Sequence, residues 1–236
     1  MSGARTAVVT GASRGIGLAV ASALASAGWR VAMIARGEAA LAEAARSVGE
    51  NALPVRCDVR DAGALRETVD LVRQEFGGAP DVLVNSAGVF ALAPAHATEP
   101  EQFEQAIEAN LTAPFRLVRA FLPAMRERGS GHVVSIGSIA DHVGLPGNSG
   151  YAASKFGLRG LHEVLRAELV GTGVRSTLVS PGPVDTPMWD DVDPDNRPGF
   201  TPRTRMLQPD AVAAAVMFVI EQPHDVNVDE IRISRS

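Results

Sequence analysis

The sequence predicts a single three-layer α/β/α domain, spanning residues 1–236, that is built on a doubly wound parallel sheet. Short runs of almost continuous apolar residues alternate along the chain with longer segments of helical periodicity. Strands that are covered by helices on both faces have this character, because neither face meets water. A chain of 236 residues with 46% hydrophobic content can bury one large core, and no linker or repeat interrupts the alternation.

The predicted elements follow one another in order. The first strand is Ala7–Thr10, and the helix after it ends near Ala27, with Gly28 as its C-cap. Six further strands are predicted at Arg30–Ala35, Leu53–Cys57, Asp81–Asn85, His132–Ile136, Val174–Ser180 and Glu230–Ile233. Four further helices are predicted at Glu38–Val48, Ala64–Phe76, Pro100–Arg128 and Ser149–Val170. Ligands of such a sheet bind at the carboxyl ends of its strands.

A glycine-rich segment joins the first strand to the first helix. Residues 11–17 read Gly-Ala-Ser-Arg-Gly-Ile-Gly, a spacing that differs from the general Gly-x-Gly-x-x-Gly dinucleotide fingerprint. Glycines allow the backbone to approach a pyrophosphate, whose charge the N-terminus of the helix stabilises. A plain tight turn is the alternative, but the strand–loop–helix context favours phosphate binding.

A tyrosine and a lysine lie four residues apart in the predicted helix that begins near residue 149. This spacing places the phenol of Tyr151 and the ammonium of Lys155 on one face. A phenol has an ordinary pKa near 10, and a positive charge beside it lowers that pKa toward neutrality, as acid–base catalysis requires. Ser138 can then hold a substrate oxygen next to the phenol. A chance pair on a surface helix is the alternative for this motif taken alone.

Together these motifs resemble the short-chain dehydrogenase/reductase family of the single-domain, Rossmann-like type, from about Ala4 to Ser236. The family's motifs occur here in order, at Thr10 to Gly17, Asn85-Ser86-Ala87-Gly88, Asn110, Ser138, Tyr151 with Lys155, and Pro181-Gly182. The chain departs from the family pattern at Ser86, where a second Asn is usual, and at Gly137, where a Ser is common. It also lacks the frequent Gly-Gly ending.

The resemblance implies an oxidoreductase with four catalytic residues. Tyr151 would exchange a proton with the substrate oxygen, which Ser138 would orient. Lys155 would hold the nicotinamide ribose and bias the phenol. Asn110 would bend its long helix and anchor a water that leads a proton to Lys155.

Charge favours NADP(H) over NAD(H) as the cofactor. NAD enzymes place an acidic residue after the second strand to bind the ribose 2′-hydroxyl, whereas NADP enzymes use an arginine for the 2′-phosphate. Here Arg36 follows that strand, and Arg14 can reach the same phosphate from the glycine-rich loop. NAD(H) stays open, because Glu38 is near and Arg36 can be a solvated surface residue.

The family resemblance also implies the remaining cofactor contacts, with Asp58 and Val59 at the adenine. The full set of expected cofactor-binding residues is Gly11, Ser13, Arg14, Gly15, Ile16, Gly17, Arg36, Asp58, Val59, Asn85, Ala87, Gly88, Tyr151, Lys155, Pro181, Gly182, Val184 and Thr186.

Two segments are expected to form the substrate pocket, residues 139–150 and a proline-rich lid at about 185–208. Substrate contacts are expected from Ser138, Tyr151, Met188 and Trp189. His142 either lines the cleft or lies in a surface loop. A disordered segment without a binding role is the alternative for the lid.

Composition excludes several classes of function. The net charge is −5 without a basic block, so neither nucleic acid nor an anionic membrane is an expected partner. One cysteine, Cys57, forms no intrachain disulfide, and the five histidines lack metal-ligand spacing, so no metal is expected. Without a signal pattern or a long apolar run, a cytoplasmic protein with a small-molecule substrate is expected.

Three functional classes remain open. The first is an active NADP(H)-dependent oxidoreductase that acts on a carbonyl or secondary alcohol, and the intact catalytic residues favour it. The second is a catalytically inactive dinucleotide-binding regulator, and the third is a structural subunit. Within the enzyme class, an NAD-dependent alcohol or 3-hydroxy acid dehydrogenase is the alternative, because the tail Asn227–Ile233 resembles members that act on 3-hydroxy acids such as serine.

A homodimer or homotetramer is also expected, because relatives pair through the helices predicted at 100–128 and 149–170. We expect the sheet to bury one apolar stripe of the first helix, formed by Phe103, Ile107, Leu111, Phe115, Val118 and Leu122. On the second helix the corresponding stripe is Leu158, Leu161, Leu165 and Leu169. Apolar residues off these stripes indicate a second buried face, namely Ala106, Ala113, Phe121 and Val164.

Overall fold

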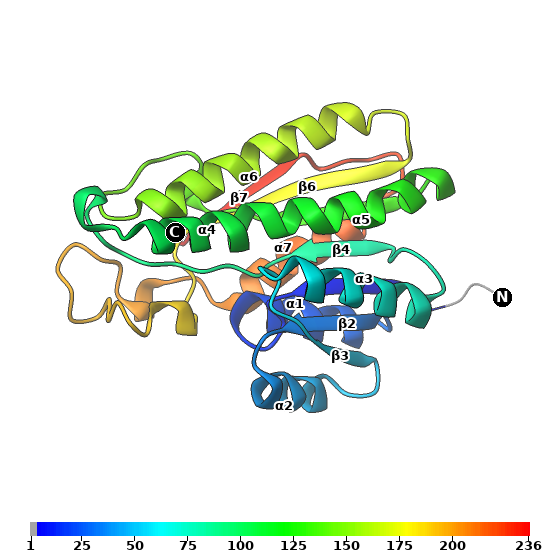
Figure 1. The fold of residues 1–236 in the computed structure, drawn as a ribbon, viewed down its shortest axis with the longest axis horizontal. Helices are drawn as coiled ribbons and strands as arrows, with labels where there is room; N and C mark the ends of the chain where they lie inside the picture. Colours follow the sequence, from blue (N-terminus) through cyan, green and yellow to red (C-terminus); the bar gives the residue numbers. More distant parts are fainter. Residues whose placement is uncertain (1–3) are drawn as a thin grey trace.

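The computed structural model describes residues 4–236 and contains a seven-stranded parallel sheet between two layers of helices (Figure 1). The strand order is β3-β2-β1-β4-β5-β6-β7, and each neighbouring pair is parallel. The strands are β1 Thr6–Thr10, β2 Arg30–Ala35, β3 Ala52–Arg56, β4 Val82–Asn85, β5 Gly131–Ile136, β6 Val174–Pro181 and β7 Glu230–Ile233. The chain therefore starts in the middle of the sheet and winds outward in both directions, which confirms the predicted doubly wound fold.

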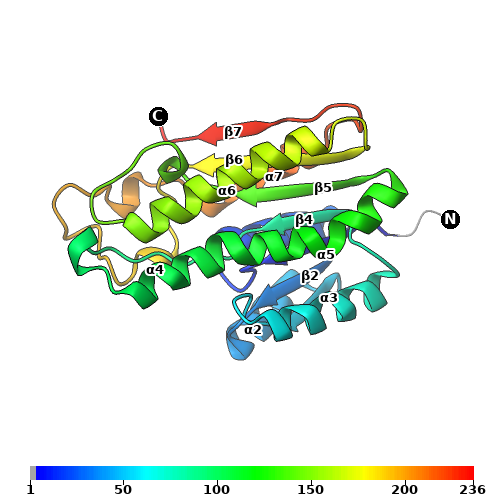
Figure 2. The same ribbon diagram turned by 45° about the horizontal axis from the view of Figure 1, so that its top comes forward.

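The helices cover both faces of this sheet. They are α1 Gly15–Ser26, α2 Glu38–Val48, α3 Ala62–Phe76, α4 Pro100–Ile107, α5 Ala113–Arg128, α6 Ser149–Glu168 and α7 Pro209–Ile220. One hydrophobic core joins α1, α2 and α7 to the sheet, and a second joins α3, α5 and α6 to its other face. Figure 2 shows the strands pointing toward the end of the molecule where the segment before α7 lies.

Helix α7 is absent from the sequence prediction. Its segment Pro209–Ile220 is apolar on almost every side, so it lacks the polar face that marks an amphipathic helix. The structure buries Val212 and Val216 in the same core as Leu24 of α1. The proline at its first turn is a typical helix start and is the one local signal that was available.

The sequence prediction was wrong for part of the face that the long α4–α5 rod buries, although Val118 of the expected stripe is buried as predicted. The structure leaves Phe103 39% and Phe115 48% exposed, although both belong to the stripe that was expected to be buried. It buries Ala106, Ala113 and Phe121 instead, and these had been assigned to the outer face. Ala113 and Phe121 lie in the core on this face of the sheet, and Phe103 and Phe115 are left outside it.

Along residues 4–236, no helix combines the length and the apolar character that crossing a membrane requires.

Replacing Phe121 with alanine is expected to lower the free energy of unfolding by about 3–5 kcal/mol, because the ring is 1% exposed and leaves a cavity. The matched variant Phe115→Ala, on the outer face of the same helix, is expected to change it by less than about 1 kcal/mol. Urea unfolding at the lowest practical protein concentration measures both. A larger loss for Phe115→Ala would contradict the observed helix orientation.

Candidate active site

A cavity of about 750 Å³ lies at the carboxyl ends of the strands. Its walls come from the segments that follow β1, β2, β3, β4, β5 and β6, and from the first turns of α6. Most of the residues predicted to bind cofactor or substrate line it, namely Gly11, Ser13, Arg14, Gly15, Ile16, Gly17, Arg36, Asp58, Val59, Ala87, Gly88, Ser138, Tyr151, Lys155, Pro181, Gly182, Val184, Thr186, Met188 and Trp189. Asn85, Asn110 and His142 do not belong to this lining.

The glycine-rich loop forms the wall of the cavity next to α1. Gly11 and Gly15 have φ angles of +70° and +56°, which favour glycine over residues with a side chain. A Cβ at Gly17 would lie 2.4 Å from the Gly11 carbonyl oxygen, so the loop closes only with glycine there. Arg14 is the N-cap of α1 and makes no side-chain capping bond, which leaves the first N–H groups of the helix available for an anion.

Guanidinium groups gather at the end of the cavity that lies beyond β2 and β3. Arg14 and Arg36 both line it, and both are exposed. Arg60 also lines it and forms a two-point ion pair with Asp58, with Nη2–Oδ2 at 2.7 Å and Nε–Oδ1 at 3.0 Å. Hydrogen bonding to Arg60 lowers the pKa of Asp58, so the carboxylate stays ionised. Arg60 was not predicted, because a single arginine after a strand has no motif.

Asn110 connects three segments around the site. It lies in a π-helical turn, Glu108–Thr112, that joins α4 to α5. Its side chain accepts a hydrogen bond from the Val89 N–H at 2.8 Å and donates one to the Val89 carbonyl at 3.0 Å. It also donates to Ser154 Oγ at 2.9 Å, and that hydroxyl donates to the Tyr151 carbonyl at 2.7 Å. Asn110 therefore positions the start of α6 relative to the loop after β4.

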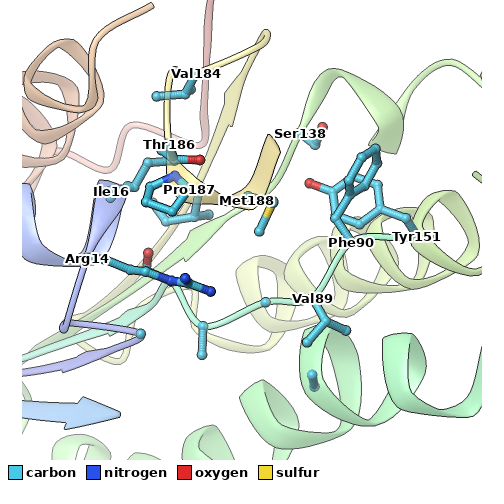
Figure 3. A pocket seen from close by; sticks show the side chains of 18 of the residues that line it. Arg14, Ile16, Val89, Phe90, Ser138, Tyr151, Val184, Thr186, Pro187 and Met188 are labelled. Atoms are coloured by element: carbon cyan, nitrogen blue, oxygen red, sulfur yellow. The ribbon is translucent and has the colours of Figure 1, made fainter. Parts of the chain in front are cut away.

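Ser138, Tyr151 and Phe90 lie together on one side of the cavity, while Arg14 and Ile16 lie on the other side (Figure 3). The Lys155 ammonium lies 5.6 Å from the centre of the Tyr151 ring. Its Nζ donates a hydrogen bond of 2.7 Å to the Ile136 carbonyl at the end of β5. The predicted serine, tyrosine and lysine are thus brought to one wall.

The pKa of the phenol departs from the sequence prediction. We expected Lys155 to lower the pKa of Tyr151, but burial raises it to about 12, and the charge of Asp141 acts in the same direction. The hydrogen bond with Ser138 opposes this shift. Burial lowers the pKa of Lys155 to about 8, although Asp141 raises it. In the protein alone, desolvation therefore outweighs the hydrogen bond with Ser138 at the phenol and the charge of Asp141 at the lysine.

Asp141 is a buried carboxylate that the sequence prediction missed. It is 0% exposed and lies one helical turn after Ser138. Its Oδ2 accepts hydrogen bonds from the Ser138 N–H at 3.0 Å and from Ser180 Oγ at 2.6 Å. Its Oδ1 lies 3.1 Å from His142 Nε2. A Cβ at Gly137 would lie 2.3 Å from Oδ2, so glycine at that position leaves room for the carboxylate.

His142 points into a polar cluster instead of lining the cleft. Its Nε2 lies 2.7 Å from Glu230 Oε1 on β7, and its ring contacts Arg159 of α6. We therefore withdraw it as a substrate contact. The residue that the sequence prediction missed on the substrate side is Phe90. Its ring packs edge-on against Tyr151, with the ring centroids 4.9 Å apart, and against Trp189, with the centroids 5.2 Å apart.

The segment at 185–208 is tied together by one arginine. Arg203 pairs with Asp185 at 2.9 Å and with Asp190 at 2.6 Å, and donates to the Thr186 carbonyl at 3.1 Å. Trp189 Nε1 donates to the Val184 carbonyl at 3.0 Å. These bonds hold Met188 and Trp189 against the cavity.

The chain belongs to the short-chain dehydrogenase/reductase family of oxidoreductases. The family model described as short chain dehydrogenase matches residues 5–197. An uncharacterized oxidoreductase from Staphylococcus saprophyticus is 35% identical over 97% of this chain and 96% of its own length. D-threitol dehydrogenase from Mycolicibacterium smegmatis is 39% identical over 91% of this chain and 85% of its own length.

Solved structures of this family resemble the fold closely. A metagenomic short-chain oxidoreductase in complex with NADP has a TM-score of 0.85 and 34% identity, over 98% of this chain and 97% of that one. Serine dehydrogenase complexed with NADP⁺ has a TM-score of 0.88 and 30% identity, over 97% and 94%. Actinorhodin polyketide ketoreductase with NADPH has a TM-score of 0.90 and 32% identity, over 100% and 98%.

The lowered pKa of Lys155 predicts how stability changes with pH. The unfolded chain binds a proton at this lysine up to about pH 10.5, whereas the folded chain releases it near pH 8. Between these values the unfolded state holds more protons, so the lysine's contribution to stability rises with pH, by at most about 1.36 kcal/mol per unit.

Urea unfolding of the wild type and of Lys155→Met across pH 7–10 tests this. Other groups titrate in both proteins, so their effects cancel when the two free energies of unfolding are subtracted. The wild type is expected to gain stability relative to the variant as the pH rises through this range. A difference in stability that stays constant with pH would contradict the lowered pKa.

Proposed function

We propose that this chain is an NADP(H)-dependent oxidoreductase that transfers a hydride between nicotinamide and a carbonyl compound or secondary alcohol. The observation that carries the proposal is the placement of Ser138, Tyr151 and Lys155 on one wall of a cavity whose other wall is the glycine-rich loop. Burying the ammonium of Lys155 costs stability at neutral pH, as its lowered pKa indicates. An inactive regulator or a structural subunit would gain nothing from a buried lysine beside a phenol. The placement of Lys155 and Tyr151 therefore supports an enzyme.

The described residues fit a dinucleotide with a 2′-phosphate. The uncapped N-terminus of α1 and the glycines of its loop suit the pyrophosphate. Arg14 and Arg36 suit the 2′-phosphate, and the Asp58 carboxylate is neutralised by Arg60. Structural relatives solved with NADP support the same choice. When bound, the cofactor supplies or accepts the hydride.

The catalytic roles follow from the positions of the side chains. In reduction, Tyr151 donates its proton to the carbonyl oxygen, and Ser138 donates a hydrogen bond that orients this oxygen. Lys155 is mostly protonated at neutral pH, and its charge offsets the negative charge that develops on the phenol. Asn110 keeps the start of α6, and with it Tyr151, in register with the loop after β4.

The segment at 185–208 serves as a lid over the substrate end of the cavity, within one single-domain protein. Its internal ion pairs make it a unit that can move as a whole, and it carries Met188 and Trp189 to the substrate side.

Replacing Tyr151 with phenylalanine is expected to remove nearly all turnover, on the order of 10²–10⁴-fold, because one proton donor is lost. The variant should keep its NADPH affinity and its thermal unfolding temperature, since only one hydroxyl changes. Initial rates of NADPH oxidation with a panel of carbonyl compounds measure the first effect. Retention of more than a tenth of wild-type activity would rule out this mechanism.

Replacing Arg36 with alanine is expected to weaken NADPH binding by about 1.5–3 kcal/mol, the value of a charge-assisted hydrogen bond, and to leave NADH binding unchanged. The control is Arg46→Ala, an exposed arginine of α2 outside the cavity, which should affect neither dinucleotide. Fluorescence titration measures both affinities. An equal loss for NADPH and NADH would show that Arg36 does not contact the 2′-phosphate.

We also infer a homodimer or homotetramer. The outer faces of α4, α5 and α6 expose Phe103, Phe115, Phe156 and Val164, between 39% and 54% each. Exposed apolar residues gathered on neighbouring helices are typical of a protein interface. Light scattering at micromolar concentration is expected to give a multiple of the 24.7 kDa chain mass, and a mass near 24.7 kDa would refute the inference.

A further inference from the structure

The guanidinium groups that line the cavity are confined to its nucleotide end. Three guanidiniums lie there, on Arg14, Arg36 and Arg60. The fourth cation, Lys155, is 6% exposed and already donates to the Ile136 carbonyl. Within residues 4–236, no other lysine or arginine lines the cavity.

The substrate end of the cavity is walled by apolar side chains. Ile139, Leu145 and Met188 line it and are 39%, 48% and 36% exposed. Phe90 packs edge-on against the Tyr151 ring, and Trp189 packs edge-on against Phe90. Covering this apolar surface with a substrate is favourable, and the ring faces suit an aromatic or branched apolar group.

Charge at this end opposes a carboxylate. Asp191 lines the cavity and is exposed. The nearby Arg203 is held by Asp185 and Asp190. A carboxylate on the substrate would lose water, meet an acidic residue and find no free cation among the lining residues.

One neutral polar group completes this end. Asn148 lines the cavity and is 3% exposed, and its side-chain oxygen has no hydrogen-bond partner among the described residues. A buried amide without a partner suits an uncharged polar group on a ligand.

We propose that the substrate is an uncharged carbonyl compound or alcohol with an apolar or aromatic substituent, and that the site rejects carboxylated substrates. This inference rests on the proposed function and names the substrate class for the same site.

A matched pair of ketones tests the substrate class. Methyl 4-acetylbenzoate and 4-acetylbenzoate share one skeleton and differ in charge far from the reacting carbonyl. The ester is expected to have kcat/KM at least about 100-fold higher than the carboxylate, because the carboxylate is desolvated without a partner. Leu145→Arg is expected to narrow this ratio by at least about tenfold, whereas the distant Phe218→Ala leaves it unchanged.

Binding separates this inference from the proposed reaction. The chain has two tryptophans, and Trp29 is 3% exposed within the core, so ligand-dependent emission reports Trp189. With NADP⁺ present, the ester should change this emission and the carboxylate should not. Binding of the ester without any turnover in the presence of NADPH would overturn the proposed function and keep the substrate class. Equal or tighter binding of the carboxylate, or binding of neither, would overturn the substrate class.

A second inference rests on the buried carboxylate behind Ser138. The N–H of Ser138 donates to Asp141, and the N–H of Ala140 donates to Ser138 Oγ at 3.1 Å, so the serine is bonded at both its backbone and its side chain. The structure assigns Asp141 as a positioning residue that aims the Ser138 hydroxyl at the substrate oxygen. It uses the space that a side chain at Gly137 would need.

Several ionisable groups face or influence this carboxylate. Lys155 and Tyr151 of α6 respond to its charge, and His142 lies in contact with it. Glu230 of β7 and Arg159 of α6 lie behind His142. Removing the negative charge therefore lowers the pKa of Lys155, which the carboxylate raises.

Asp141→Asn tests this role by kinetics and by pH profile. We expect kcat to fall by about 10–100-fold with NADPH affinity unchanged, and the alkaline limb of the kcat profile to move to lower pH. A purely structural role would lower the unfolding temperature or the folded fraction and leave the profile in place, and that result would overturn the inference.

A double variant tests the packing claim independently of catalysis. Gly137→Ser should destabilise the protein, because its side chain meets the carboxylate. Adding Asp141→Ala should recover part of the lost stability. Strictly additive losses in urea unfolding would show that the two positions do not share space.

Discussion

The arrangement of the site depends on the amide of Asn110. This buried side chain bonds to both backbone groups of Val89 and to Ser154, so it ties the loop after β4 to the first turns of α6. The π-helical turn that carries it interrupts the long rod where Asn110 makes these bonds. An amide can donate and accept at once, which is why neither aspartate nor leucine would satisfy the same set of partners.

Burial determines the electrostatics of the site more than the pairing of charges does. Tyr151 and Lys155 are shifted toward their neutral forms, and Asp141 supplies the negative charge that keeps the lysine from shifting further. Short side-chain bonds to the ends of strands hold these groups, as when Lys155 donates to the carbonyl of Ile136. The sheet thus positions the residues of the site, and a backbone carbonyl at the end of β5 also accepts one of their hydrogen bonds.

Local patterns in the sequence predicted most of the fold. The strand Arg30–Ala35 and the helix Glu38–Val48 have their predicted bounds, because continuous apolar runs and a clear helical period mark them. Helix α3 begins two residues earlier than predicted, where Asp61 caps it. The orientation of α4–α5 was partly wrong, because two apolar stripes lie on that rod and local periodicity does not say which one faces the sheet.

Some residues of the site could likewise be predicted from local sequence patterns, and others could not. The glycine-rich loop, Ser138 and Tyr151 have fixed spacings and were found from sequence, and they line one cavity. Arg60, Phe90 and Asp141 belong to no motif. The role of Phe90 comes from neighbours that are distant in the chain, and Asp141 needs the space that Gly137 leaves. Arg60 pairs with the nearby Asp58, but only the fold shows that this pair lines the cavity. The pKa of the phenol was predicted in the wrong direction for a related reason, since desolvation depends on the whole surrounding fold.

The central claim, that the environment of one phenol controls the chemistry, has a direct spectroscopic test, because Tyr151 is the only tyrosine in the chain. Phenolate absorbance near 295 nm reports its ionisation without interference from another tyrosine. We predict little phenolate at pH 10, where a free phenol is half ionised. More phenolate is expected at the same pH with saturating NADP⁺, because a positively charged nicotinamide bound in the cavity would favour the ionised phenol. Half-ionisation at pH 10 in the native protein, unaffected by NADP⁺, would contradict the central claim.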